Sequence, residues 1–323
     1  MKKVVIFGGG TGLSQILKGL KLFPLDITAV VTVSDNGKST GKLREELNIP
    51  AVGDITKVLL SMAKNNKDTE DLLNYRFENN TSLAEHSIKN LILAALLNIK
   101  GDFKNALPIF CDLFNIEGKV LPLTEENVDL VGKTSKGDFI VGESQITSSK
   151  DDIIDLYYDK KFKINKDVEE AILNADCIVF SAGSLLTSVL PHIINKEVAS
   201  IISKSKSDKV YICNIMTQHG ETDNFKVSDH IKVLNKYLGK NIINTVIANN
   251  CRLSKDIIKK YKTTEQKDLV MIDKKEIEKI NVKLIEGKTA VVEDGVIRHD
   301  NIYTSYLLFS YLMEVNKWHF LSK

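Results

Sequence analysis

The sequence VVIFGGGTGLSQILKGL, from Val4 to Leu20, limits the fold more than any other part of the chain. An apolar run over Lys3–Phe7 predicts a buried strand, and the glycines after it predict a tight turn. Leucine and isoleucine then recur at helical spacing, and a second apolar, β-branched run follows at Ile27–Val33. Strand, helix and strand in this order form a βαβ unit, whose strands are parallel. We therefore expect an α/β protein.

The same alternation continues along the chain. Further strands are predicted at Cys177–Phe180, Val210–Cys213 and Ile242–Ala248, and helices at Asp54–Ala63, Leu83–Ile99, Asp102–Phe114 with a kink or break at Pro108, Val168–Leu173, Val227–Leu238 and Asp300–Val315. The expected fold class is α/β, Rossmann-like and doubly wound, with a mainly parallel sheet, helices on both faces and small inserted elements. We expect residues 1–323 to form a single domain.

A strand-rich segment is expected to be inserted near residues 119–147. Three short stretches, Lys119–Leu123, Asp129–Thr134 and Asp138–Ile146, resemble strands separated by polar turns. They predict a small antiparallel insertion or an edge of the main sheet. Near the C-terminus, Asp294-Gly295 lies between two β-branched runs and predicts a hairpin.

Composition excludes several classes of function. The 323 residues are 43% hydrophobic, and 44 basic residues balance 42 acidic ones, so a nucleic-acid partner is not expected. Four apolar residues precede Gly8, fewer than the roughly 7–15 of a secretory signal. The longest apolar runs are shorter than the ~20 residues of a membrane span. The four cysteines lie far apart, as is typical of free thiols in a cytoplasmic protein.

The glycine-rich turn is the first candidate site. Glycines allow a ligand to approach the backbone closely, and the helix that follows presents free N–H groups to a phosphate. The candidate ligand-binding residues here are Gly9, Gly10, Thr11 and Gly12. The third glycine of a dinucleotide fingerprint is replaced by Leu13, which argues against a nicotinamide dehydrogenase. The alternative is a structural turn without a ligand.

The segment SDNGKSTGKLR, residues 34–44, is the second candidate. It is not a Walker A loop, because Thr32 stands where that motif needs its first glycine. An acid just after the second strand often binds ribose hydroxyls, and glycines beside short polar side chains favour an anion nest. The candidate residues are Asp35, Asn36, Gly37, Lys38, Ser39, Thr40 and Arg44. The alternative is a solvated polar loop.

Two more turns follow predicted strands. Ser181, Gly183 and Ser184 come after Cys177–Phe180, and Asn214, Thr217 and Gln218 come after Val210–Cys213. Carboxyl ends of parallel strands share one sheet edge, where open α/β sheets bind ligands. We therefore expect all four turns to surround one ligand. For Ser184, a helix N-cap is the competing interpretation.

Three weaker patterns complete the candidates. His86 and Asn90 share one helix face, either in the cleft or behind it. Arg298, after the hairpin, can bind a diphosphate bidentately or form a surface ion pair. A histidine-rich and acidic stretch shows no recognised ligand spacing, so no dedicated metal site is predicted; it contains His219, Glu221, Asp223, Asp229 and His230.

These motifs together resemble a known family. The segments GGGTG, SDNGKSTGKLR, VGDITKVL, HSIKNLILAAL, GESQI, ADCIVFSAGSLLTSVLP, CNIMTQHGETDNF and VIRHD run in order from residue 8 to residue 300. The chain resembles the YvcK-like proteins of bacteria, also called gluconeogenesis factors. It is more distantly similar to 2-phospho-L-lactate transferase of cofactor F420 synthesis. The resemblance implies a Rossmann-like fold that binds a nucleotide sugar of the UDP-N-acetylglucosamine type, with Arg298 as a contact.

The resemblance also implies a cytoplasmic role linking carbon metabolism to cell-wall synthesis and cell shape. Partners in cell-envelope regulation and self-association into a homo-oligomer fit that role. The site offers few acid–base groups, so we expect a regulatory binding protein rather than an enzyme. The alternative is a transferase acting on a nucleoside-diphosphate-linked donor, in which Asp35 or Asp54 would be catalytic and hold Mg²⁺ with the nucleotide.

Several positions depart from the family pattern. The second glycine of D-N-G-G is Lys38, and G-P-G-S has become Ser181-Ala182-Gly183-Ser184. The segment G-H-S-L-G-N has become residues 85–90, with Lys89 in place of a glycine, and His219 replaces a proline. Loss of glycine restricts the approach of a ligand to the backbone, so these changes bear on ligand identity.

Overall fold

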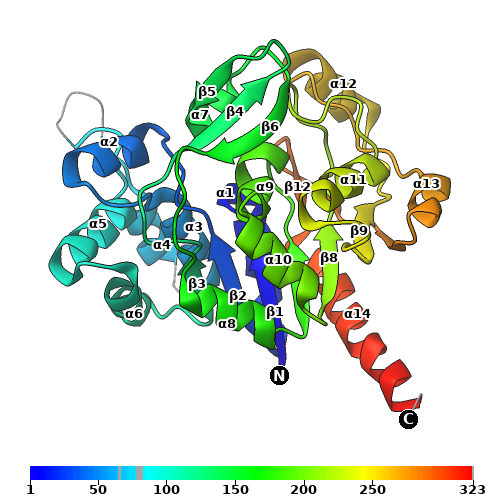
Figure 1. Ribbon diagram of the computed structural model, residues 1–323, viewed down its shortest axis with the longest axis horizontal. Helices are drawn as coiled ribbons and strands as arrows, with labels where there is room; N and C mark the ends of the chain where they lie inside the picture. Colours follow the sequence, from blue (N-terminus) through cyan, green and yellow to red (C-terminus); the bar gives the residue numbers. More distant parts are fainter. Residues whose placement is uncertain (65–66, 78–82, 322–323) are drawn as a thin grey trace.

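The computed structural model describes residues 1–64, 67–77 and 83–321, and its centre is a parallel sheet of seven strands (Figure 1). The order across the sheet is β10-β9-β8-β7-β1-β2-β3, and neighbouring strands are parallel throughout. The strands are β1 (Lys2–Phe7), β2 (Leu25–Val31), β3 (Lys119–Pro122), β7 (Cys177–Phe180), β8 (Asp208–Ile212), β9 (Thr245–Asn249) and β10 (Lys283–Gly287).

The middle of the sheet is fully buried. Four consecutive apolar side chains of β1, from Val4 to Phe7, are at most 2% exposed, and all of β7 is buried. Such runs form where helices cover both faces of a parallel sheet. Phe7 stacks on Phe180 with ring centroids 5.7 Å apart, which joins the two central strands.

Two layers of helices cover the sheet, which confirms the predicted doubly wound α/β class. In one layer α1 packs against α3 and α14, and in the other α10 packs against α8, α9 and α11. Helices α8 and α10 lie in front of the strands in Figure 1. The bounds are α1 (Gly10–Leu20), α3 (Gly53–Met62), α8 (Lys166–Asn174), α9 (Leu190–Ile193), α10 (Lys196–Lys204), α11 (Val227–Leu238) and α14 (Asn301–Leu321).

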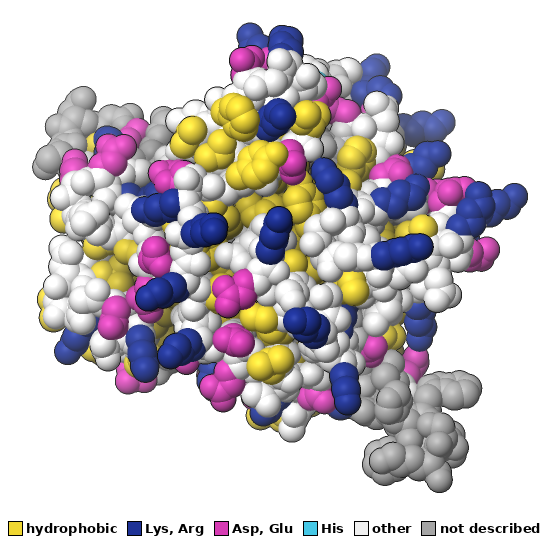
Figure 2. Space-filling model, viewed as in Figure 1, with side chains coloured by type: hydrophobic (Ala, Val, Ile, Leu, Met, Phe, Trp, Pro, Cys, Tyr) yellow, Lys and Arg dark blue, Asp and Glu magenta, His cyan; other side chains and the backbone are white. Residues whose placement is uncertain are grey.

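A separate three-stranded sheet lies beyond the carboxyl ends of the main strands (Figure 1). It pairs β4 (Leu130–Thr134) with β5 (Phe139–Val141) and β6 (Ile153–Tyr158), all antiparallel. The Tyr158 hydroxyl donates to the Pro191 carbonyl at 2.8 Å, which fixes this sheet to α9. Figure 2 shows apolar side chains gathered on the molecular surface near it.

The remaining elements surround these sheets. They are α2 (Lys38–Leu47), α4 (Lys67–Asn74), α5 (Ile88–Lys100), α6 (Phe103–Leu113), α7 (Glu143–Thr147), the π-helix η1 (Leu185–Val189), α12 (Lys255–Thr264), α13 (Lys274–Lys279), β11 (Ala290–Glu293) and β12 (Val296–His299). The hairpin predicted at Asp294-Gly295 joins β11 and β12 and is confirmed.

Some helix predictions were wrong. No helix is predicted in residues 34–44, but α2 runs from Lys38 to Leu47, with the Gly41 amide donating to the Gly37 carbonyl at 2.7 Å, so the alternative of a solvated polar loop is wrong. Helix α5 begins at Ile88 rather than Leu83, because Glu85 has a φ of 73°, which a helix does not allow. Pro108 lies inside α6, which continues through it.

The strand-rich segment is also divided differently. Lys119–Pro122 pairs with β2 in the main sheet, so it is not part of an insertion. The strand expected over Asp138–Ile146 ends at Val141, because Gly142, with a φ of 101°, turns the chain into α7. The single-domain organisation of the chain stays a prediction.

In the described part of the chain, no single helix is long and apolar enough to cross a membrane. Two consecutive helical segments, residues 185–193 and 196–204, together have the length and apolar composition of a membrane span, but they are bent by 73° relative to each other.

The contact between α1 and α14 depends on a glycine. A Cβ on Gly19 would collide with the Asn301 carbonyl oxygen, and beside it the Ser305 hydroxyl donates to the Ile16 carbonyl at 3.2 Å. We expect Gly19→Ala to lower the free energy of unfolding by about 2–3 kcal/mol, because α14 must move away from α1. Chemical denaturation measures this change. Exposed Lys18→Ala should change it by less than ~0.5 kcal/mol, and equal effects would contradict the contact.

Candidate functional site

The candidate site lies at the carboxyl edge of the sheet, where β1 has β2 on one side and β7 on the other. The strand order reverses here, because β2 and β3 continue to one side and β7 to β10 to the other. Such switch points leave a crevice between the turns that follow the two central strands.

The turns after β1 and β7 meet backbone to backbone. A Cβ on Gly12 would collide with the Ala182 carbonyl oxygen and lie 3.0 Å from the Gly183 Cα. The side-chain amide of Asn214 fixes the second turn, because it accepts from the Gly183 amide at 2.9 Å and donates to the Gly183 carbonyl at 2.7 Å. Gly10 has a φ of 56°, which favours glycine. No side chain caps the N-terminus of α1 at Gly9.

A cavity of about 540 Å³ opens on one side of this contact, and we call it the turn cavity. Its lining includes Thr11, Gly12, Gly183, Ser184, Asn214, Thr217, Gln218, Lys267 and Arg298. Arg298 comes from β12, and its Nε lies 3.8 Å from Glu293 Oε2, so the guanidinium has only a loose partner. Three of the four predicted turns therefore contribute to one cavity.

A second cavity, of about 900 Å³, lies beside α2, α3 and the start of α5, and we call it the charged cavity. Its lining includes Asp35, Gly37, Ser39, Thr40, Asp54, Lys57, Arg76, Phe77, Glu85, Lys89 and Asn90. The fourth predicted turn lines this cavity rather than the turn cavity.

The two cavities adjoin at the glycine-rich turn. A Cβ on Gly9, which lines the turn cavity, would lie 2.6 Å from Asp54 Oδ2, which lines the charged cavity. Lys57 of the charged cavity donates from Nζ to Thr11 Oγ1 of the turn cavity at 2.7 Å. A ligand that follows the turn would therefore pass from one cavity into the other.

Carboxylates dominate the electrostatics at this junction. Burial and the Asp35 charge raise the pKa of Asp54 to about 6, against the opposing effects of Lys57 and a hydrogen bond from Gly10. Glu143, from α7, has its pKa raised by burial and by the charges of Asp54 and Asp35. These carboxyl groups lack a full complement of cations, so the junction favours a positive ion or a proton.

Mg²⁺ brought by a nucleotide fits this chemistry. Mg²⁺ binds oxygen ligands, usually one or two carboxylates together with phosphate oxygens and water. Asp35 and Asp54 provide such carboxylates. Among the residues described, no three His, Cys, Asp or Glu side chains are grouped to hold a metal, so a diphosphate would have to complete the set.

A buried chain of hydrogen bonds supports the floor of the charged cavity. The Thr56 hydroxyl donates to Asn90 Oδ1 at 2.7 Å, Asn90 Nδ2 donates to Ser39 Oγ at 3.4 Å, and Ser39 Oγ lies 3.1 Å from His86 Nδ1. His86 and Asn90 are 5% and 3% exposed. His86 therefore acts behind Ser39, whereas Asn90 also lines the cavity.

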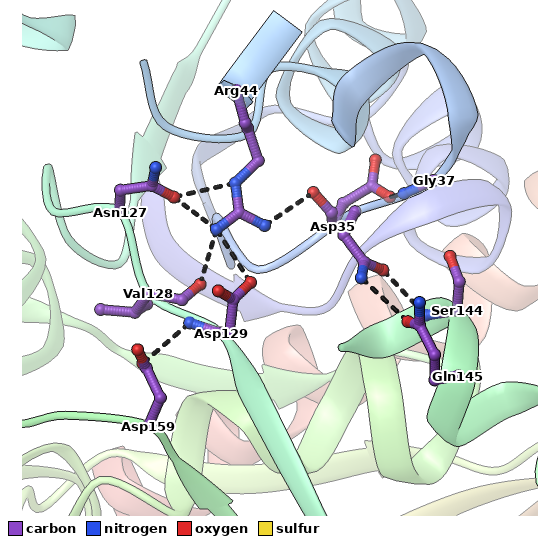
Figure 3. Close-up of polar contacts among 10 residues, drawn as sticks. Asp35, Gly37, Arg44, Asn127, Val128, Asp129, Ser144, Gln145 and Asp159 are labelled. Atoms are coloured by element: carbon purple, nitrogen blue, oxygen red, sulfur yellow. Dashed lines mark hydrogen bonds and ion pairs between the residues drawn. The ribbon is translucent and has the colours of Figure 1, made fainter. Parts of the chain in front are cut away.

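Arg44 and Asn36 form protein contacts instead of facing either large cavity (Figure 3). The Arg44 guanidinium donates to Asn127 Oδ1, to the carbonyls of Asp35 and Val128, and to Asp129 at 3.0 Å. Asn36 Nδ2 donates to Gln145 Oε1 at 3.0 Å, and Asn36 Oδ1 accepts from the Ser144 amide at 2.9 Å. These contacts hold residues 35–44 against residues 127–129, which lead into the small sheet, and against α7.

The remaining predicted site residues differ in whether they line a cavity. Ser184 caps η1 by accepting from the Thr187 amide at 3.0 Å, and its hydroxyl donates to Glu221 at 2.8 Å. Gln218 also donates to Glu221. Ser181 is fully buried, outside both cavities. Lys38 begins α2, and its side chain lies outside the described part.

The histidine and acidic side chains between His219 and His230 do not meet at one point. His219 pairs with Asp223 at 3.3 Å on the surface, and Glu221 faces Ser184 instead. Nδ1 of His230 lies 3.1 Å from the Lys226 carbonyl in the interior. These placements separate the residues whose closeness in sequence suggested a metal.

Three charged residues of the site were missed from the sequence. Lys57 stands one helical turn after Asp54, a spacing that shares a helix face and was available as a clue. Lys89 directly precedes Asn90 in a segment already under consideration. Glu143 lies on α7, between two strands of the small sheet, and nothing local in the sequence indicates its electrostatic interaction with Asp54.

Comparisons with known proteins identify the family and agree with the fold. The family model described as 2-phospho-L-lactate transferase CofD matches residues 4–290. The chain is 39% identical to the gluconeogenesis factor of Halalkalibacterium halodurans, over 93% of each chain. It is 38% identical to the gluconeogenesis factor of Bacillus subtilis, over 97% of this chain and 98% of the relative. A crystal structure of a Bacillus halodurans protein superposes with a TM-score of 0.91 at 38% identity, over 95% of this chain and 99% of that one.

The Arg44 contacts predict a large loss of stability on substitution. We expect Arg44→Met to lower the free energy of unfolding by about 2–3 kcal/mol, because the buried acceptors around the guanidinium lose their donors. Lys42, on the same helix, forms an exposed pair with Glu85 at 3.2 Å, so Lys42→Met should cost less than ~1 kcal/mol. Urea denaturation compares them, and similar values would contradict a structural role for Arg44.

The raised pKa of Asp54 predicts a pH-dependent change in stability. The unfolded chain ionises Asp54 near pH 4 and the folded chain only near pH 6, so the folded state loses stability as pH rises through this interval. We expect Asp54→Asn to gain about 3 kcal/mol over the unsubstituted protein at pH 7.5 and nothing at pH 4. Thermal unfolding at both pH values measures this difference. Exposed Asp152→Asn should show no such gain, and a gain for Asp54→Asn that is independent of pH would refute the assignment.

Proposed function

Because the chain belongs to the 2-phospho-L-lactate transferase CofD family, we propose that it binds a nucleotide sugar of the UDP-N-acetylglucosamine type. In this proposal the protein is a cytoplasmic regulator that links carbon metabolism during gluconeogenic growth to cell-wall synthesis and cell shape. The names of its relatives support the metabolic part, since they are called gluconeogenesis factors.

The observation that carries the proposal is the polar turn cavity at the switch point of the sheet. The start of α1 suits a diphosphate, because helix N-termini favour anions and the N-cap residue Gly9 has no side chain to occupy the position, although the Gly10 amide hydrogen-bonds to Asp54. Arg298 lies in the same lining with a loose partner, and its planar guanidinium suits phosphate oxygens. The turn at residues 214–218 lines the same cavity and offers backbone groups for the base or ribose.

A binding role without turnover agrees with the state of the polar side chains. Ser184, Gln218 and Asn214 are engaged with neighbouring protein groups, and His86 is buried behind Ser39. None of them is placed as a nucleophile beside a base. The cavity therefore orients a ligand through backbone groups and charges, which suits a sensor.

A transferase is the second candidate, and the carboxylates at the junction favour it. The carboxylates of Asp35 and Asp54 suit Mg²⁺ held together with a diphosphate, because oxygen ligands of this kind are those that Mg²⁺ takes. Mg²⁺ bound with the diphosphate would supply charge stabilisation to a leaving phosphate. Asp35 and Asp54 would hold it, and Lys57 would orient the chain of phosphates through Thr11.

Isothermal calorimetry tests the proposed ligand. UDP-N-acetylglucosamine should bind the unsubstituted protein, and Arg298→Met should weaken binding by at least about tenfold, because a charge-assisted contact is lost. Exposed Arg252→Met, away from both cavities, should bind within ~2-fold of the unsubstituted protein. Absence of heat with UDP-N-acetylglucosamine and with other UDP-sugars at millimolar concentration would rule the proposal out.

Product analysis separates the two candidates. The protein is incubated with UDP-N-acetylglucosamine with and without Mg²⁺, and released nucleotide is measured. A regulator leaves the ligand intact. Steady release that needs Mg²⁺ and disappears in Asp35→Asn would establish the transferase instead.

A further inference from the structure

One part of the charged cavity carries three cations, of which Lys57 also acts on Asp54. Lys57, Arg76 and Lys89 all line it. Lys89 Nζ donates a hydrogen bond to the uncharged side chain of Asn74, at 2.6 Å from Oδ1. Among the residues that the structure describes, no ion pair involves Lys89. Burial and the charges of Lys57 and Arg76 lower the pKa of Lys89 to about 8, and no carboxylate contributes to that shift. A half-buried ammonium beside two other cations favours an anion.

The acids of this cavity belong to other parts of its lining. Asp35 and Asp54 lie at the ends of α2 and α3, near the glycine-rich turn. Glu85 pairs with Lys42 at 3.2 Å. The cations come from α3 (Lys57), from the chain between α4 and α5 (Arg76, which also donates to the Glu85 carbonyl) and from the first turn of α5 (Lys89). The cavity is therefore divided into an acidic part at the turn and a basic part farther along.

Lys57 connects the basic part with the turn cavity. Its ammonium donates to Thr11 Oγ1 at 2.7 Å, and its charge acts on Lys89. A nucleotide whose diphosphate lies at the glycine-rich turn would thus extend its sugar past Lys57 toward Lys89 and Arg76. A volume of about 900 Å³ gives ample room for a hexose with a substituent.

We propose that the charged cavity takes the sugar of a nucleoside diphosphate sugar that carries a carboxylate on a short alkyl arm, with Lys89 and Arg76 binding the carboxylate. This rests on the proposed function and adds the class of sugar. The planar Arg76 guanidinium matches a carboxylate, and Phe77 offers an apolar surface to the arm. A single negative charge suits a cavity that also holds Asp35 and Asp54, whereas a phosphate dianion would be repelled more strongly.

Two probes that differ only in that arm test the proposal. UDP-N-acetylmuramic acid is UDP-N-acetylglucosamine with a lactyl ether on the sugar. Calorimetry on the full chain should give an affinity for the lactyl form that is about tenfold higher, the size of one charge-assisted contact. In Lys89→Gln and in Arg76→Gln the ratio of the two affinities should fall to near one. Lys100→Gln, exposed at the other end of α5, should keep the unsubstituted ratio.

The ratio within each variant makes the test independent of partial misfolding, because both probes meet the same protein. Equal affinities for the two probes, or a preference for the neutral sugar, would overturn the inference while leaving nucleotide-sugar binding in place. Failure of both probes to bind would count against the proposed function itself. Titration with free D-lactate distinguishes a separate anion site, since binding of lactate alone with unchanged probe affinities would also overturn the inference.

Discussion

The structure depends on the backbone contact between the turns that follow β1 and β7. Gly12 leaves no room for a side chain beneath the Ala182 carbonyl, and the Asn214 amide holds Gly183 from the other side. Because β1 and β7 are the central strands, any shift of these turns would displace α1 and η1 together. The contact fixes the start of α1 within the crevice, and the two cavities are defined by their position relative to it.

Charge, rather than shape alone, differentiates the two cavities. The turn cavity combines helix amides with Arg298, which suits a diphosphate. The charged cavity combines the carboxyl groups of Asp35 and Asp54 near the turn with the cations Lys57, Arg76 and Lys89. A neutral interior would hold a ligand by contact area only. This one imposes an order of charges along the ligand, and that order supports the proposed orientation of a nucleotide sugar.

The sequence predicts the central fold well for a physical reason. Strands buried on both faces, such as β1 and β7, must be continuous apolar runs, so Lys3–Phe7 and Cys177–Phe180 are evident without a structure. Helix α2 is missed because its glycines and short polar residues favour a loop locally. The sequence predicts Arg44 and Asn36 as ligand contacts, because their actual partners, Asn127 and Gln145, lie 83 and 109 residues away. Local pattern identifies which turns meet at the edge of the sheet, but the division into two cavities arises from tertiary packing.

The hydrogen bond between Lys57 and Thr11 has a thermodynamic consequence for the whole molecule. The Lys57 ammonium group borders both cavities. A ligand group that attracts it in one cavity therefore changes the free energy of binding in the other. Linkage requires that influence to be mutual and of the same magnitude in both directions. For a single ligand that spans both cavities, the binding energies of its two halves are therefore not additive, and a substitution of Lys57 would alter the contribution of both.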